Sequence, residues 1–271
     1  MNYYLDTEFL EGTQKKTFLG INVGETKPTI DLISIGIVAE DGREYYAISK
    51  DFNLKEAWNR WQQRTGEGDR NIIEPRYYWI RENVLKPIFY ELQDKSNLSV
   101  RKEVARMGYS SRKIVNKKFT LSNLRWLIKN YGKSNDQISE DIKDFCKSGV
   151  IGIDKNAPNY IWDGWQIITR TNPKFYAYYA DYDWVAFCWL FGKMMNLPNG
   201  FPMYCRDLKQ EFDNIPELVN KWNLAVGANK EKYCDLKMLK SDPTYPKQEN
   251  EHNALDDARW NKKLHEFIKN I

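Results

Sequence analysis

Apolar residues in the first fifty positions occur in short runs, which is the pattern of β-strands. Residues 3–5 form a short aromatic run, and residues 30–38 form a nearly continuous β-branched run that is typical of a buried central strand. Between them, residues 10–29 are rich in Gly, Lys and Thr and indicate a long loop or an irregular hairpin. Asp41-Gly42 is a hairpin signal, after which residues 43–49 continue as a partner strand. The chain is therefore predicted to open with three strands, of which the second and third are antiparallel.

Helical patterns take over after residue 50. The spacing of apolar residues predicts helices over residues 54–61, 76–92, 98–107, 121–131 and 134–145. Pro87 is expected to kink or divide the second of them, because proline lacks a backbone N–H. Residues 149–173 contain Gly, Asn and Pro in close succession and are predicted to be irregular.

The last hundred residues return to strands before the chain ends in a helix. The elements predicted there are an aromatic strand over 175–180, a buried apolar helix over 184–195, a short strand over 203–206, short helices over 207–212 and 216–222, and an amphipathic helix over 254–268. Strands on either side of a helical middle predict an α/β fold, with a mixed β-sheet covered by helices on both faces.

Length and composition suit one large α/β domain. The chain has 271 residues, of which 42% are apolar, and this is enough for a substantial core. The four cysteines show no C-x-x-C spacing, so buried free thiols in a reducing compartment are expected. No apolar run approaches the roughly 18 residues of a membrane span, and the N-terminus has no signal-peptide pattern, so a cytoplasmic location is expected.

Positive charge is concentrated in one segment. Residues 95–133 hold eleven Lys or Arg residues against one acid, so this segment carries +10 and the rest of the chain −6. Tyr109, Phe119 and Trp126 are interleaved with these cations, a combination that favours nucleic-acid binding. The alternative is a solvated, lysine-rich helical hairpin. The candidates for phosphate contacts in this segment are Arg112, Lys113, Lys117 and Lys118.

Asp6 and Glu8 stand two residues apart at the end of the first predicted strand. Side chains on a strand alternate between faces, so these two carboxylates point the same way and repel each other unless a cation lies between them. Mg²⁺ and Mn²⁺ prefer oxygen ligands of this kind. On this pair alone, a solvated strand edge is the favoured interpretation, and other acids must converge on the same place before a metal site is indicated.

His252 and Asp257 form a second candidate pair. Their five-residue step puts the histidine at or before the start of the last predicted helix and the aspartate about one turn inside it, so both can face one cleft. A lone histidine near a helix start is more often structural than catalytic. His252 differs because its motif comes third in an ordered series, after the first acidic pair and after Asp183, which follows the aromatic strand. His265, the other histidine, is expected to be a surface or packing residue.

Three segments in this order resemble the DEDDh subgroup of the 3′–5′ exonucleases, which have a ribonuclease H-like fold. The segments are YYLDTEFLEG with TIDLISIGIVAEDGREYYAIS, then YYADYDWVAFCWLFGKMMNLP, then EHNALDDAR. Histidine rather than tyrosine in the third motif distinguishes this subgroup. The likeness is closest to small bacterial single-domain exoribonucleases and covers about half of the chain. Residues 54–133, which include the basic segment, and residues 149–173 depart from it, so the chain is interpreted as one exonuclease domain carrying a mainly helical insertion.

The resemblance implies a metal-dependent site. His252 would take the proton from the attacking water. Asp181 competes with Asp183 for a place in the site, and Asp183 is preferred because it directly precedes the predicted helix. Asp256 is expected to point away from the site into solvent. The carboxylates that would hold two divalent ions, Mg²⁺ or Mn²⁺, roughly 4 Å apart are Asp6 as the bridge, Glu8, Asp183 and Asp257.

The activity implied by the resemblance is 3′–5′ hydrolysis of phosphodiester bonds with release of nucleoside 5′-monophosphates, on RNA in preference to DNA. Thr7 and Phe9 flank the first motif as candidate substrate contacts, and Thr7 is expected to pack inward. Two alternatives remain, namely a phosphodiesterase acting on short oligonucleotides or small nucleotides, and a nucleic-acid-binding module with a relict site. The oligomeric state stays open, with a homodimer among the alternatives.

Overall fold

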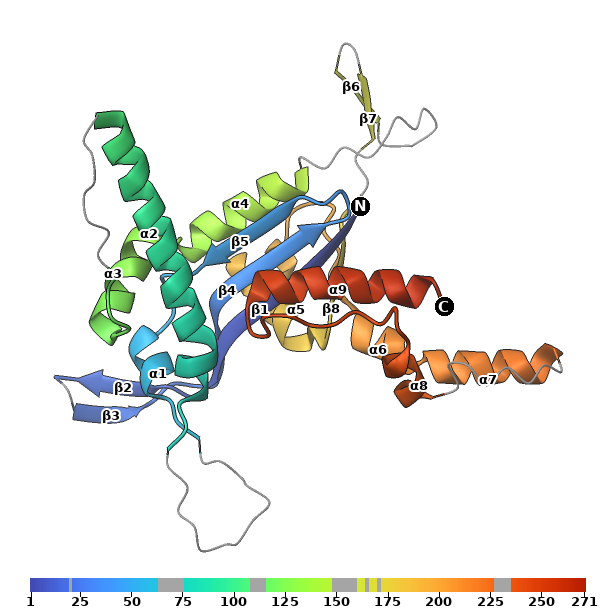
Figure 1. The fold of residues 1–271 in the computed structure, drawn as a ribbon, viewed down its shortest axis with the longest axis horizontal. Coiled ribbons are helices and arrows are strands. Elements are labelled where there is room, and N and C mark those ends of the chain that lie inside the picture. Colours follow the sequence, from blue (N-terminus) through green and yellow to red (C-terminus); the bar gives the residue numbers. More distant parts are fainter. Residues whose placement is uncertain are drawn as a thin grey trace, which may run out of the picture. The chain divides into compact units, whose positions relative to one another are not determined.

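A computed structural model of the chain describes residues 1–19, 21–62, 76–107, 116–147, 160–163, 166–169, 172–226 and 235–271. The chain forms two compact units, whose helices and strands are labelled in Figure 1. The first unit comprises Met1–Thr7, Ile35–Tyr46 and Ser139–Ile271. The second comprises Glu8–Ser34 and Ala47–Ile138.

A five-stranded sheet has the order β5-β4-β1-β8-β9. The strands in this order are β5 (Glu44–Ile48), β4 (Thr29–Ala39), β1 (Asn2–Gly12), β8 (Lys174–Ala177) and β9 (Arg206–Asp207). Strand β8 runs parallel to both β1 and β9. Strands β4 and β5 form a hairpin, in which the Ala39 N–H donates to the Arg43 carbonyl at 2.8 Å and Gly42 takes the left-handed backbone (φ 87°) that the tight turn requires. The predicted α/β fold with a mixed sheet is confirmed and is compatible with a ribonuclease H-like fold.

Alternating side chains of β1 show how helices cover both faces of this sheet. The ring of Tyr3 lies 5.9 Å from that of Phe145 on α4 (Asn135–Lys147). Its strand neighbour Phe175 lies 5.0 Å from Phe187 on α5 (Ala180–Leu190). Tyr4 points to the opposite face, where its hydroxyl forms a 2.9 Å hydrogen bond with Nδ1 of His265 on α9 (Ala254–Lys269). The aromatic run at the start of the chain therefore anchors α9 on one face and α4 and α5 on the other.

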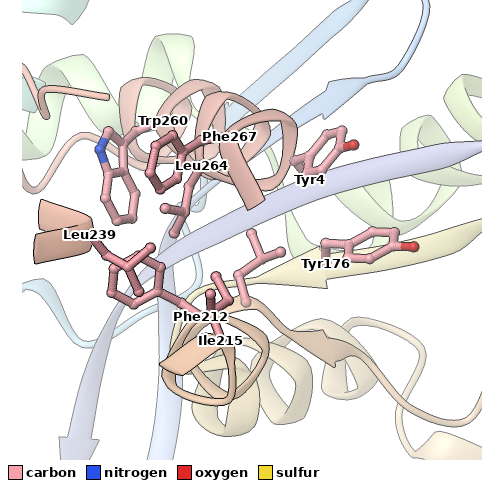
Figure 2. Close-up of a cluster of buried hydrophobic side chains, with 9 residues drawn as sticks. Tyr4, Tyr176, Phe212, Ile215, Leu239, Trp260, Leu264 and Phe267 are labelled. Atoms are coloured by element: carbon pink, nitrogen blue, oxygen red, sulfur yellow. The ribbon is translucent and has the colours of Figure 1, made fainter. Parts of the chain in front are cut away.

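A buried apolar cluster holds α9 against the sheet and against α6 (Leu208–Asp213), as Figure 2 shows. Short helices α7 (Ile215–Val226) and α8 (Leu236–Ser241) complete this cluster. Burying each large apolar side chain of this kind contributes roughly 1.5–3 kcal/mol to folding. The members of the cluster are Tyr4, Tyr176, Leu208, Phe212, Ile215, Leu239, Trp260, Leu264 and Phe267.

The start of α9 lies directly on the backbone of β4 at Gly36. A Cβ atom at this position would stand 2.2 Å from the Ala254 carbonyl oxygen and 2.5 Å from the Cα of Leu255. Only glycine permits two backbones to approach this closely. Asn261, two turns further along α9, donates its side-chain amide to the Leu5 carbonyl of β1 at 2.9 Å. The first turns of α9 are therefore fixed at the centre of the sheet.

The second unit is mainly helical apart from a hairpin of β2 (Lys15–Phe18) and β3 (Ile21–Glu25). This hairpin is one of the two structures predicted for residues 10–29. Its helices are α1 (Leu54–Asn59), α2 (Lys86–Met107) and α3 (Leu121–Tyr131), with a π-helical turn, η1 (Arg81–Leu85), leading into α2. Phe119 joins the three helices, because its ring lies 4.8 Å from Trp58 of α1 and 5.3 Å from Phe89 of α2. The described part of residues 54–133 is mainly helical, as predicted, whereas their status as an insertion in one domain stays a prediction.

Several predicted boundaries are wrong. Helix α2 runs without a break through the gap between the helices predicted over 76–92 and 98–107. Pro87 does not divide it, because the π-helical turn η1 directly precedes the proline and already interrupts the α-helical hydrogen-bond pattern there. The region predicted to be irregular contains a hairpin of β6 (Tyr160–Asp163) and β7 (Gln166–Thr169), whose sequences are rich in β-branched and aromatic residues.

The apolar helix predicted over 184–195 is α5, which begins at Ala180 and ends at Leu190. Gly192 takes a left-handed backbone just beyond it (φ 83°), and a separate 3₁₀ turn, η2 (Met194–Asn196), follows. Among the described helices, none is both long and apolar enough to cross a membrane. Three cysteines are free thiols, of which Cys188 is buried, as predicted, whereas Cys146 and Cys205 are half-buried.

Candidate metal and substrate site

Three carboxylates from the two ends of the chain lie together. Asp6 and Glu8 lie two residues apart on β1, which continues without a break from the first unit into the second. Asp257 lies in the first turn of α9. The N-cap of this helix is Asn253, whose side-chain oxygen accepts hydrogen bonds from the Leu255 and Asp256 N–H groups. One carboxylate oxygen from each of Asp6, Glu8 and Asp257 lies within 4.8 Å of the others. This is the donor set that a hard divalent cation prefers.

Both oxygens of Asp257 accept hydrogen bonds. The Gln248 side-chain amide donates to Oδ1 at 2.7 Å, and the His252 backbone N–H donates to Oδ2 at 2.9 Å. Burial raises the pKa of Asp257, while these two hydrogen bonds oppose the rise. The donor of the second bond is held in a left-handed backbone conformation, with φ 69° at His252 and φ 51° at Asn250. The charge of the His252 side chain also lowers the pKa of Asp257, which indicates that the imidazole lies near this carboxylate.

Asp183 is hydrogen-bonded to Thr7, the residue that follows Asp6. Thr7 is buried, as predicted, and its backbone N–H and hydroxyl both donate to Asp183 Oδ1, at 2.9 and 2.6 Å. Neither bond occupies Oδ2. Burial and, to a smaller extent, the charge of Asp257 raise the pKa of Asp183 to about 7, against the opposing effect of the Thr7 bonds. A buried carboxyl group of this kind gains more from a neighbouring cation than an exposed one does.

Asp181 and Asp183 occupy different environments. Asp181 is exposed, whereas Asp183 is 6% exposed. Residues two apart on a helix point in nearly opposite directions, which separates the two side chains. The expectation that Asp183 directly precedes the helix is wrong, because α5 begins at Ala180 and Asp183 lies inside its first turn. The preference for Asp183 therefore stands on its burial and its Thr7 contacts.

Two further residues around α9 differ from expectation. Asp256 is not simply solvated, because its Oδ1 accepts a 2.5 Å bond from Arg259, which also pairs with Glu44 of β5. Gln248 had no signal in the sequence, since an isolated glutamine in a loop carries none. Of the two alternatives predicted for His265, a surface or a packing residue, the structure shows the second, because the side chain is buried. Burial lowers its pKa to about 4, so the ring is neutral.

A cavity of about 500 Å³ lies within the second unit beside Glu8. Arg60 fixes one wall of it by donating to the Thr13 carbonyl at 2.6 Å and to the Glu11 carbonyl of β1. Gln62 and Tyr77 exchange backbone hydrogen bonds of 3.0 and 3.2 Å, which hold two chain segments together at its other side. The residues lining the cavity are Glu8, Phe9, Glu11, Gly12, Arg60, Trp61, Gln62, Trp79 and Ile80.

Phe9 thus lies in an aromatic pocket whose other rings come from distant positions. Trp61 is 48% exposed and is covered on one side by the Arg76 guanidinium, 4.9 Å from the ring centre. Sequence reasoning missed Trp61 and Trp79, because their proximity to Phe9 depends on how α1 and η1 pack. Of the predicted phosphate contacts, Lys117 and Lys118 precede α3, and Arg112 and Lys113 lie outside the described residues.

Comparison with known proteins finds two curated relatives, both named 3′–5′ exoribonuclease, from Mycobacterium tuberculosis strains H37Rv and CDC 1551. Each is 27% identical to this chain over 214 residues, which is 79% of this chain and 75% of the relative. This similarity supports a place among the 3′–5′ exonucleases. No family model matches the chain. The DEDDh subgroup stays a prediction.

Proposed function

We propose that this chain is a metal-dependent 3′–5′ exoribonuclease that removes nucleoside 5′-monophosphates from the 3′ end of RNA. The observation that carries the proposal is the convergence of Asp6, Glu8 and Asp257 to within 4.8 Å. The two relatives, both named 3′–5′ exoribonuclease, support the same activity and the same substrate class.

The donor set fits divalent cations such as Mg²⁺ or Mn²⁺. The three clustered groups are carboxylates, which are the ligands that these ions prefer and which repel one another without a cation. Asp183 would be the fourth ligand through Oδ2, since Thr7 engages only Oδ1. When bound, two divalent ions favour ionisation of a water molecule and stabilise the leaving 3′ oxygen.

His252 is the proposed general base. Its backbone N–H donates to Asp257 at 2.9 Å, and the charge of its side chain lowers the pKa of that carboxyl group, which supports an imidazole near Asp257. An imidazole nitrogen takes the proton of the attacking water, a role that histidine side chains often fill as general bases. Gln248 and Thr7 orient the ligands: Gln248 donates to Asp257 and Thr7 to Asp183. Such supporting hydrogen bonds fix a carboxylate in the orientation that binding requires.

The aromatic pocket beside Glu8 supports a nucleotide as the ligand. Phe9, Trp61 and Trp79 line it together with the side chain of Gln62. Aromatic rings stack on any nucleobase, which contributes roughly 1–3 kcal/mol per base with little dependence on sequence. We propose that the pocket receives a base near the 3′ end, so that the adjacent phosphodiester lies at the carboxylates.

The test is digestion of a 20-nucleotide RNA labelled at its 5′ end, with Mg²⁺ or Mn²⁺, followed by analysis of the released products. The expected result is a ladder that shortens from the 3′ end together with nucleoside 5′-monophosphates. The matched control is the same RNA joined into a circle, which has no 3′ end and should stay intact. Hydrolysis of dinucleotides alone would favour the small-substrate phosphodiesterase, and binding without any hydrolysis would favour the relict module.

A further inference from the structure

One face of α3 carries positive charge and an exposed tryptophan. The buried residues Leu124, Leu127 and Ile128 attach this helix to the second unit. Arg125, Trp126 and Lys129 lie on the side that faces solvent, because residues three and four apart share one side of a helix. We use the name "α3 face" for these three residues together with Lys117 and Lys118, which precede the helix.

The cations of the α3 face lack acidic partners. No aspartate or glutamate occurs between residues 116 and 133. In the part of the chain that the structure describes, none of the four cations forms an ion pair. Other exposed lysines do pair with an acid three or four residues away, with examples at Lys86, Lys143, Lys147 and Lys221. The field of the α3 face is therefore uncompensated by nearby acids, which suits a polyanionic partner.

Trp126 adds a second, independent feature. Its side chain is a large ring that is 44% exposed, and Lys117 Nζ lies 4.2 Å from the ring centre. A flat exposed ring with a cation above it is the combination that single-stranded nucleic acid uses, because the base stacks on the ring while a phosphate meets the cation. An acidic protein would satisfy the charges and leave the ring without a stacking partner.

The α3 face is held in place before any ligand binds. The Lys117 backbone N–H donates to Gln93 Oε1 of α2 at 2.6 Å, and Asn123 of α3 donates its side-chain amide to the Lys118 carbonyl at 2.9 Å. Phe119 is packed between Trp58 of α1 and Phe89 of α2. Because these residues are already fixed, binding costs little conformational entropy in the protein backbone.

We propose that the α3 face binds the phosphodiester backbone of single-stranded RNA upstream of the reacting 3′ end, with one base stacked on Trp126. The inference rests on the proposed function in one respect, namely that the RNA bound by this face is also the substrate of the enzyme. The face shares no residue with the aromatic pocket or with the carboxylate cluster, so its proposed role is affinity for long RNA and not the chemical step. A dinucleotide needs no second surface and is expected to be hydrolysed independently of it.

The experiment measures binding of a fluorescent 20-nucleotide RNA by anisotropy in EDTA, which prevents hydrolysis, across a series of KCl concentrations. The charge variant combines Lys117→Gln, Lys118→Gln, Arg125→Gln and Lys129→Gln. Its control combines Lys86→Gln, Lys143→Gln, Lys147→Gln and Lys221→Gln, which removes the same net charge elsewhere. Each phosphate contact on a single strand contributes roughly 0.7 to the log–log salt slope, so the charge variant should flatten the slope by up to about 2.8 and the control much less.

A second pair of variants tests stacking. Trp126→Ala should weaken RNA binding roughly 5- to 150-fold without changing the salt slope, whereas Trp189→Ala, at a tryptophan that is similarly exposed (47%), should leave it unchanged. All variants must keep the unfolding midpoint of the parent protein. Equal weakening by both charge variants, or unchanged affinity and slope in the charge variant, would overturn the proposal. Selective loss of binding to polyglutamate with RNA affinity intact would also overturn it, since the face would then serve an acidic protein.

Dinucleotide hydrolysis separates this inference from the proposed activity. If the parent protein hydrolyses dinucleotides and all α3 variants do so at the parent rate, the face acts on long RNA alone, as proposed. If the parent hydrolyses nothing while the α3 variants still lose RNA affinity, the proposed exonuclease fails and the RNA-binding face stands. A loss of dinucleotide hydrolysis in the charge variant would contradict the separation of binding from chemistry.

Discussion

Replacing Gly36 with alanine should disturb both stability and the candidate site. The added Cβ would lie 2.2 Å from the Ala254 carbonyl oxygen and 2.4 Å from the Ala254 carbonyl carbon. These neighbours are backbone atoms, so no side chain can rotate away to make room. Separation to about 3.4 Å, an ordinary van der Waals contact, requires β4 and the start of α9 to move apart by about 1.2 Å.

The magnitude follows from that displacement. Overpacking of a core typically costs about 1–3 kcal/mol, and a backbone-to-backbone clash belongs at the upper end of this range. Asp257 lies one turn beyond Ala254 on α9, so the same movement shifts its carboxylate relative to Asp6. A misplacement of about 1 Å can slow an enzyme about 10²-fold. We expect Gly36→Ala to lose at least about 2 kcal/mol of unfolding free energy and about 10²-fold in single-turnover hydrolysis of RNA.

Ser34→Ala is the matched control. Ser34 lies two residues before Gly36 on the same side of β4, is 1% exposed, and its hydroxyl has no hydrogen-bond partner among the described residues. Removing that hydroxyl should be nearly neutral or slightly stabilising. Urea unfolding and single-turnover kinetics on both variants make the comparison. A Gly36→Ala protein with parental stability and rate would refute the argument that the two backbones must stay in contact.

Three further predictions concern the chemistry. EDTA should abolish RNA hydrolysis and Mg²⁺ or Mn²⁺ should restore it, because the candidate ligands are carboxylates; undiminished hydrolysis after thorough chelation contradicts a metal site. Asp183→Asn should remove nearly all turnover while Asp181→Asn keeps most of it, because only Asp183 is buried and bonded to Thr7; the reverse ranking in a kinetic assay would exchange their roles. His252→Ala should slow the chemical step about 10²–10⁴-fold with metal affinity retained, as measured by calorimetry and single-turnover kinetics; parental rates would make His252 structural.

Local patterns in the sequence were sufficient for much of the fold. The β-branched run over 30–38 and the Asp41-Gly42 turn predicted β4 and its hairpin partner, because strand burial and tight turns depend on neighbouring residues. The last helix was predicted to within one residue at its end, since its apolar stripe repeats with the helical period. The same local rules placed Asp6 and Glu8 on one side of a strand.

Predictions failed where packing overrides local preference. The predicted start of the helix was too late, because α5 begins at Ala180 and has Asp181 and Asp183 in its first turn, where acids are favoured by the helix dipole. The helix packs through Phe187 on the sheet. The aromatic residues Trp61 and Trp79 read as ordinary core or surface positions in the sequence. Only the packing of α1 and η1 brings them to one pocket with Phe9.

The sequence by itself determined which residues carry the candidate chemistry, because spacing along a strand or a helix end is a matter of local geometry. Only the tertiary structure decided that Asp257 meets Asp6 and Glu8, that Thr7 holds Asp183, and that Gln248 holds Asp257. These contacts join opposite ends of the chain. They depend on the strand order, which puts β1 between β4 and β8. They also depend on the absence of a side chain at Gly36, which allows the start of α9 to pack against the sheet. Strand order and helix docking are set by the burial of the whole core, which no local window of sequence contains.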